Sequence, residues 1–255
     1  MYPVLFRVFG FDVEAFWVTV IVGFVAALFV ARAELRRTGH DVEIAYDLIL
    51  ASYLGGFAGA RLFLIFSAWE AFRRDPFELL FSGSGWVWQG GVIGGTITVL
   101  LAARRRGVPF VDVADLAGPC LAIGQTIGRL GCQLSGDGDY GVASDLPWAM
   151  SYPNGVVPTE VRVHPTPVYE MIAYAMLFVF LWRQRHRPRP PGNLFGQYLV
   201  LSGAVRFAVE FVRRNPIVGW GLTLPQWMSL VWMIAGSALL RHLHGAPRAA
   251  PARAT

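Results

Sequence analysis

Seven long apolar segments constrain this chain more than any other feature of its sequence. Crossing the hydrocarbon core of a bilayer, about 30 Å thick, takes roughly 20 helical residues, and each segment comes close to that length. The segments are Ala15–Ala31, Ile44–Phe66, Trp86–Ala103, Val113–Leu134, Val168–Trp182, Leu194–Phe211 and Leu224–Leu240. With 55% hydrophobic and only 15% charged residues, the chain is too apolar for an ordinary soluble domain. We therefore predict an all-α polytopic membrane protein with about seven transmembrane helices.

The distribution of basic residues predicts how the chain is oriented. The net charge of +5 would also suit a nucleic-acid-binding protein, but all 22 basic residues are arginine and they are unevenly placed. When the loops are assigned alternately to two sides, thirteen arginines fall on one side and six on the other. By the positive-inside rule, the N-terminus then faces out and the C-terminus lies in the cytoplasm of a bacterial inner membrane, and no nucleic-acid partner is expected.

The domain organisation predicted from the sequence is simple. Residues 1–240 form a single transmembrane domain with one outward loop, 135–164, and residues 241–255 form a disordered cytoplasmic tail that is small, basic and rich in Pro and Ala. We expect no cleavable signal peptide. The two cysteines, Cys120 and Cys132, give neither a disulfide framework nor a metal-binding pattern.

Three arginines, Arg61, Arg129 and Arg206, lie inside apolar segments. A charge in a bilayer is costly, so each marks a functional site by default. Arginine binds phosphate oxygens through its planar fork, which predicts an intramembrane site for an anionic lipid. The alternative for Arg206 is an ion pair with Glu210, four residues further along the same helix.

Small and acidic residues surround Arg129. Gly128 and Gly131 flank it and leave room for a bulky group beside the guanidinium. The stretch 136–141 (GDGDYG) follows directly, and we interpret Asp137 as part of an active-site rim; a flexible exposed turn, or an imitation of a calcium loop, is the alternative.

Two further elements are predicted on the outer side. The glycine cluster that contains Gly90 and Gly91 either packs closely against another helix or admits a lipid head group. His164, Tyr169 and Glu170 enter the membrane at the start of the fifth segment, where burial would raise the pKa of a carboxyl group unless an arginine pairs with it.

In combination, these motifs resemble the prolipoprotein diacylglyceryl transferase family over most of the chain. The most specific motifs are Gly-Arg-Leu-Gly at 128–131 and Arg-Phe-x-x-Glu-Phe-x-Arg at 206–213. The others, in order, are Gly59-Ala-Arg61, Gly90-Gly91, His164-Pro-x-x-x-Tyr-Glu170 and Gln226.

The resemblance implies an enzyme that moves the diacylglyceryl group of phosphatidylglycerol to the cysteine thiol of a prolipoprotein, near its signal peptide, and releases glycerol phosphate. Arg129 and Arg206 would hold the phosphate, Glu210 would fix Arg206, and a base would generate the thiolate nucleophile. Arg61, Gly90, Gly91, Gly128, Gly131, His164, Tyr169 and Arg213 would bind the substrates. No cofactor or metal is implied.

The chain departs from the family pattern at several polar positions. Gln89 stands where family members commonly have a histidine before the glycine pair, and an amide cannot take a proton. Cys132, Phe16 and Ser202 stand where the family has an asparagine and two tyrosines, and Asp137 takes the place of a glutamate. The base would then be Glu170, Asp137 or His164. The alternatives to this enzyme are a lipid-binding or lipid-transporting paralog with a different acceptor or no standard catalysis, and a structural membrane subunit.

Overall fold

The structure, a computed structural model, describes residues 1–77 and 87–245. Its long helices correspond to the seven predicted segments, except that Trp86 lies outside the described residues. They are α1 (Ala15–Thr38), α2 (Ile44–Ser67), α5 (Trp88–Arg105), α6 (Phe110–Ser135), α7 (Thr166–Gln184), α8 (Asn193–Glu210) and α9 (Leu224–Gly245), and α3 (Trp69–Arg74) is a short helix after α2. The chain is therefore mostly helical, as predicted.

Three small antiparallel sheets correct the all-α prediction. Strand β1 (Val4–Val8) pairs with β2 (Phe11–Glu14), β3 (Met150–Tyr152) with β4 (Thr159–Val163), and β5 (Ile217–Gly219) with β6 (Leu222–Thr223). Each lies outside the long apolar segments. Glycines with positive φ, Gly10 at +87° and Gly221 at +75°, form part of the tight turns of the first and third hairpins.

Three of the helices, α1, α2 and α6, are long and apolar enough to cross a membrane by length and composition. This supports a membrane protein. A topology with seven crossings, and the side on which each terminus lies, stay predictions.

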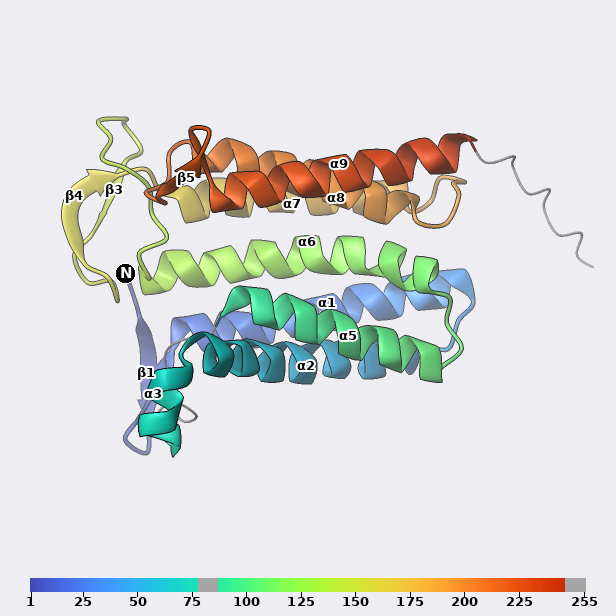
Figure 1. Cartoon of the computed structure of the whole chain (residues 1–255), viewed down its shortest axis with the longest axis horizontal. Coiled ribbons are helices and arrows are strands. Elements are labelled where there is room, and N and C mark those ends of the chain that lie inside the picture. The colour runs from blue at the N-terminus through green and yellow to red at the C-terminus, as the bar shows by residue number, and fades with distance from the viewer. Residues whose placement is uncertain (78–86, 246–255) are drawn as a thin grey trace, which may run out of the picture. The chain divides into compact units, whose positions relative to one another are not determined.

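The described chain divides into two compact units. The first contains residues 1–27 and 114–255, and the second contains 28–113. In the first unit, α8 packs against both α7 and α9 (Figure 1). The core of this unit is a cluster of buried side chains from α6, α7 and α8: Ala122, Tyr174, Leu177, Leu181, Leu194 and Tyr198.

Helix α8 is fixed at its start by a side chain of another helix. The carboxylate of Asp115 in α6 accepts hydrogen bonds from the backbone N–H groups of Gly192 (2.8 Å) and Phe195 (2.9 Å). These N–H groups are among those that a helix cannot satisfy internally at its N-terminus. Asp115 therefore positions α8, whose far end carries Arg206.

The second unit is built on a close contact between α2 and α5. A Cβ atom added to Gly90 would lie 2.3 Å from the carbonyl oxygen of Gly59, and one added to Gly94 would lie 2.2 Å from that of Gly55. The hydroxyl of Thr98 in α5 also donates to the carbonyl of Ala51 in α2 at 2.7 Å. Small residues thus let the two backbones touch, as in many membrane helix pairs.

The first residues of the predicted disordered tail are helical. Residues 241–245 continue helix α9, and residues 246–255 lie outside the described part of the chain.

Candidate functional site

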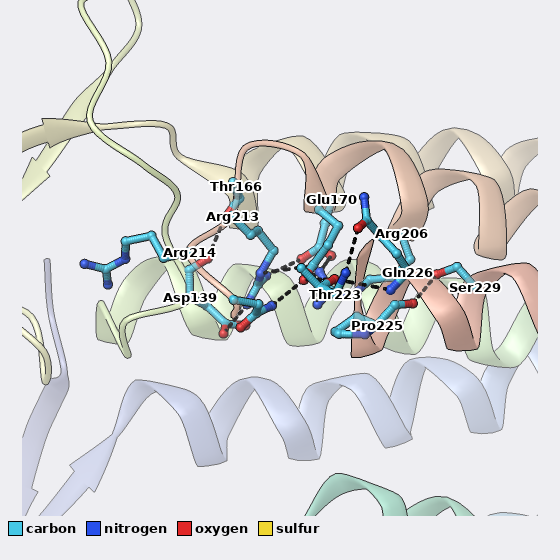
Figure 2. A network of polar contacts seen from close by, with 12 residues as sticks. Asp139, Thr166, Glu170, Arg206, Arg213, Arg214, Thr223, Pro225, Gln226 and Ser229 are labelled. Carbon is cyan, nitrogen blue, oxygen red and sulfur yellow. Dashed lines mark hydrogen bonds and ion pairs between the residues drawn. The ribbon is translucent and has the colours of Figure 1, made fainter. Parts of the chain in front are cut away.

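A network of three arginines and three carboxylates joins α6, α7, α8 and the segments that follow α6 and α8 in the first unit (Figure 2). The cations are Arg129, Arg206 and Arg213, and the anions are Asp139, Glu170 and Glu210. These groups carry three positive and three negative charges when all are ionised. The two intramembrane arginines that the sequence singled out in this unit, Arg129 and Arg206, therefore lie in one cluster.

Glu170 is the central anion of this network. One of its oxygens accepts from Arg206 at 2.9 Å, and the other lies 2.8 Å from Nε of Arg129 and 3.4 Å from Nη1 of Arg213. Because all three guanidiniums share this one carboxylate, it holds them together. The same contacts occupy both of its oxygens.

Glu210 fixes the other side of Arg206. The two side chains form the i, i+4 ion pair that the sequence offered as an alternative, at 2.9 Å. The second oxygen of Glu210 accepts from Asn215 at 2.6 Å and from the Thr223 hydroxyl at 2.8 Å. Gln226 in turn accepts from the backbone N–H of Thr223 at 2.9 Å. Arg206 pairs with Glu210 and with Glu170 at the same time. The ion pair with Glu210 therefore does not exclude a functional site at Arg206.

Asp139 closes the network from the loop after α6. Its carboxylate pairs with Arg129 and lies 2.5 Å from Nη2 of Arg213, while its backbone carbonyl accepts from the Thr166 hydroxyl. Burial alone would raise the pKa of Asp139, but the positive charges of Arg129 and Arg213 outweigh it and lower that pKa below its usual range. Asp139 is thus held as an anion.

The members of the network differ in their exposure to solvent. The side chains of Glu170 and Glu210 have 0% exposure, whereas Arg129 keeps 24% and Arg206 18%. Asp139, at 33%, is the most exposed of the carboxylates. An incoming ligand would therefore meet the edges of Arg129 and Arg206 and the carboxylate of Asp139.

Asp137 lies next to this network, and within the described residues its carboxylate forms no ion pair with an arginine. Its carboxylate accepts from the backbone N–H of Asp139 at 3.2 Å. Burial raises the pKa of Asp137, and the charge of Asp139 raises it further. A carboxylate with a raised pKa is better suited to accept a proton than an ordinary one.

The thiol of Cys132 accepts from Arg129 at 3.8 Å, so this position still contacts the arginine although the family has an asparagine there. Ligand atoms of Cys132, Asp137 and Asp139 lie within 4.8 Å of one another. The two guanidiniums paired with Asp139 would oppose a metal ion at this cluster.

His164 and Tyr169 lie side by side at the start of α7. The ring Nδ1 of His164 is 3.2 Å from the Tyr169 hydroxyl, which accepts from the Trp148 indole at 2.8 Å. This small cluster joins the segment between α6 and α7 to the first turn of α7, where Glu170 also lies.

The two glycines around Arg129 differ in their surroundings. A Cβ atom on Gly128 would meet nothing within 4 Å, whereas one on Gly131 would lie 2.1 Å from the Thr19 hydroxyl of α1. Gly128 therefore leaves the space that the sequence suggested, and Gly131 is required for helix packing.

Four of the predicted residues belong to the second unit and are described within it. Arg61 lies in α2, and Gln89, Gly90 and Gly91 lie in the first turn of α5. Arg61 and Gln89 are half-buried. Gly90 faces the backbone of α2, which gives it a packing role; a role beside a head group stays a prediction for both glycines.

The sequence did not single out three residues that complete the network. From the sequence, we assign Asp137 to the site and not Asp139, although both belong to the motif at 136–141. Gly138, at φ +93°, separates the two aspartates and lets them point to different partners. Asn215 precedes the β5–β6 hairpin and Thr223 is the last residue of β6, and no spacing rule links them to Glu210.

Known proteins that resemble this chain belong to one family. The sequence pattern of that family, described as prolipoprotein diacylglyceryl transferase, matches residues 3–242. A phosphatidylglycerol–prolipoprotein diacylglyceryl transferase of Methylobacillus flagellatus is 32% identical, with 93% of this chain and 95% of the relative covered. Relatives of the same name from Bordetella avium and Chromohalobacter salexigens are 32% and 34% identical, each over 93% of this chain and over 92% and 90% of their own lengths. The chain therefore belongs to the prolipoprotein diacylglyceryl transferase family.

Proposed function

We propose that this protein transfers the diacylglyceryl group of phosphatidylglycerol to the lipobox cysteine of a prolipoprotein. The observation that carries the proposal is the network itself, in which partly exposed Arg129 and Arg206 are backed by fully buried Glu170 and Glu210. The names of the relatives, which specify phosphatidylglycerol and prolipoprotein, support the choice of substrates.

The reaction forms a thioether. The sulfur of the deprotonated cysteine attacks the glyceryl carbon that bears the phosphate ester, the C–O bond breaks, and its electron pair leaves on glycerol phosphate. Negative charge grows on the leaving phosphate as this bond breaks. Arg129 and Arg206 stabilise that charge, and Glu170 and Glu210 hold both guanidiniums in place before the reaction begins.

The thiol proton needs an acceptor. The candidate bases differ in the contacts that their side chains already make. Glu170 has both oxygens in ion pairs, and Gln89 carries an amide. Asp137 is half-buried beside Arg129 and Cys132, and burial raises its pKa. We assign Asp137 as the general base, with His164 as the alternative.

We further propose that all seven long helices cross a bacterial inner membrane, with the N-terminus outside and the outward loop 135–164 above the site. The thirteen-to-six distribution of arginines supports this orientation.

The direct test is an assay with the purified full chain, phosphatidylglycerol and a lipobox peptide, with the thioether product detected by mass spectrometry. We expect product with the intact chain and a loss of roughly 10²–10³-fold in rate for Arg129→Ala, because the leaving phosphate loses one charged donor. Arg241→Ala, an exposed arginine of α9, is the matched control and should keep its rate. Product formation at an unchanged rate in Arg129→Ala would contradict the assignment of the phosphate site.

A second candidate function is lipid binding without transfer, and Gln89 is the observation that favours it. If position 89 supplies the base in the family, this chain binds the phosphate and leaves the thiol protonated. The intact chain would then give no thioether product while Gln89→His would give it. Product from the intact chain contradicts this second candidate.

A further inference from the structure

A groove on the surface of α7 lies apart from the ionic network. It encloses about 490 Å³ and is lined by residues of the second half of α7 and the turn that follows. Its apolar wall is formed by Ala175, Met176, Val179 and Phe180, and its polar end by Arg183, Gln184 and Arg187. Apolar and charged side chains are therefore segregated along one stripe of a helix.

The distance from the start of the apolar wall to the first arginine is close to the thickness of one leaflet. From Ala175 to Arg183 the helix rises about 12 Å, and half of a bilayer's hydrocarbon core is about 15 Å thick. Met176, Val179 and Phe180 are all exposed. Exposing these apolar side chains to water is unfavourable, whereas an acyl chain lying along the helix would cover them.

The arginines at the end of the groove differ from those of the network. Within the described residues, neither Arg183 nor Arg187 has a carboxylate in ion-pair contact. Two guanidiniums without an internal anion provide a site for one external anion, and arginine prefers phosphate.

An aromatic residue outside the groove lies next in sequence to its polar end. Trp182 precedes Arg183, and the guanidinium carbon of Arg185 lies 3.3 Å from the centre of its ring. Tryptophan collects at the interface between lipid and water, which places the arginines at the level of the head groups.

We infer that this groove binds an anionic phospholipid, with one acyl chain along Ala175–Phe180 and the phosphate at Arg183 and Arg187. Basic pockets at helix ends recognise anionic head groups in this way. This site needs no turnover, so it stands whether or not the protein catalyses diacylglyceryl transfer.

The test uses a photoactivatable phosphatidic acid with a diazirine in its acyl chain, added to the purified full chain in a zwitterionic detergent. Labelled peptides that contain residues 175–187 are quantified by mass spectrometry, so that labelling at the ionic network is counted separately. We expect saturable labelling of this segment by phosphatidic acid and little by the matched phosphatidylcholine probe.

Two sets of variants make the result specific. Arg183→Gln and Arg187→Gln should each weaken labelling of this segment roughly five-fold, and the double variant about 30-fold, whereas Arg241→Gln should not. Val179→Trp should block the groove, while Ile172→Trp, on an exposed part of α7 outside the groove, should not. Equal labelling by phosphatidylcholine, or full labelling of the double variant, would overturn the inference.

Discussion

At the residue scale, the site depends on where each carboxylate lies relative to the arginines. Glu170 and Glu210 are enclosed and bind only cations and hydrogen-bond donors of the protein, whereas Asp137 stands beside the network. Acidic residues of similar intrinsic acidity are thereby placed in different surroundings. We propose that Glu170 and Glu210 organise the arginines and that Asp137 accepts the thiol proton.

The proposed base predicts a dependence on pH. Burial and the charge of Asp139 raise the pKa of Asp137, so its carboxylate becomes available only above a pKa higher than the ordinary value of about 3.9. The transfer rate should therefore rise with pH through this raised pKa, and Asp137→Asn should lower kcat by roughly 10²–10⁴-fold. The measurement is the pH profile of kcat/KM for both proteins.

The control is Asp145→Asn, an exposed carboxylate in the same outward loop, which should keep the rate and the profile. If Asp137→Asn retains both the rate and the acid limb, the base lies elsewhere and His164→Gln is the next variant to measure.

A second prediction concerns the stability of the network. Glu170→Gln removes the anion shared by three guanidiniums and leaves their charge partly buried and unbalanced. We expect a loss of about 3–5 kcal/mol in the free energy of unfolding, measured by thermal unfolding in detergent. Glu160→Gln, an exposed carboxylate of β4, should change it by less than about 0.5 kcal/mol. Equal stabilities of the two variants would mean that Glu170 does not hold the network together.

At the scale of elements, the contact between α2 and α5 separates two roles for neighbouring glycines. Gly90→Ala places a Cβ atom 2.3 Å from the Gly59 carbonyl oxygen, so the helices must move apart, at a cost of about 1–3 kcal/mol. Gly91→Ala meets its nearest atom, the Gly56 carbonyl oxygen, at 3.4 Å and should fold almost normally. Thermal unfolding and transfer activity are measured for both variants.

The outcome for Gly91→Ala decides whether this region touches substrate. Normal stability with lost activity would support close approach of a head group. Normal stability with normal activity would leave the glycine pair a packing role alone.

The sequence was sufficient to predict the helices but not the hairpins. Long apolar segments predict helices such as α6 and α8 within a few residues, because each depends on its own composition. The β5–β6 hairpin is too short to give such a signal. Asn215, before the hairpin, and Thr223, at its end, contact Glu210 only because the chain folds back there. The role of Asp139 was also not predictable from the sequence, because it depends on the backbone conformation at Gly138. That conformation determines which of the two aspartates faces the arginines.

At the scale of the whole molecule, the orientation in the membrane is open to test. Seven crossings with the N-terminus outside place the C-terminus in the cytoplasm. A green fluorescent protein fused after residue 255 should therefore fluoresce, and alkaline phosphatase fused at the same position should be inactive. The same reporters inserted after Asp145, in the outward loop, should behave oppositely. An active phosphatase at the C-terminus would place that end outside and contradict the proposed orientation.

The equal numbers of cations and anions in the network have a consequence for how a substrate enters. Because every guanidinium there already has a carboxylate partner, an arriving phosphate cannot simply fill an unbalanced positive charge; it must exchange with an anion that is present. Asp139 is the most exposed carboxylate and the one that a head group can replace at Arg129. Because its three cations and three anions leave the network with no net charge, it attracts a distant head group only weakly, and lipid binding there should respond only weakly to ionic strength.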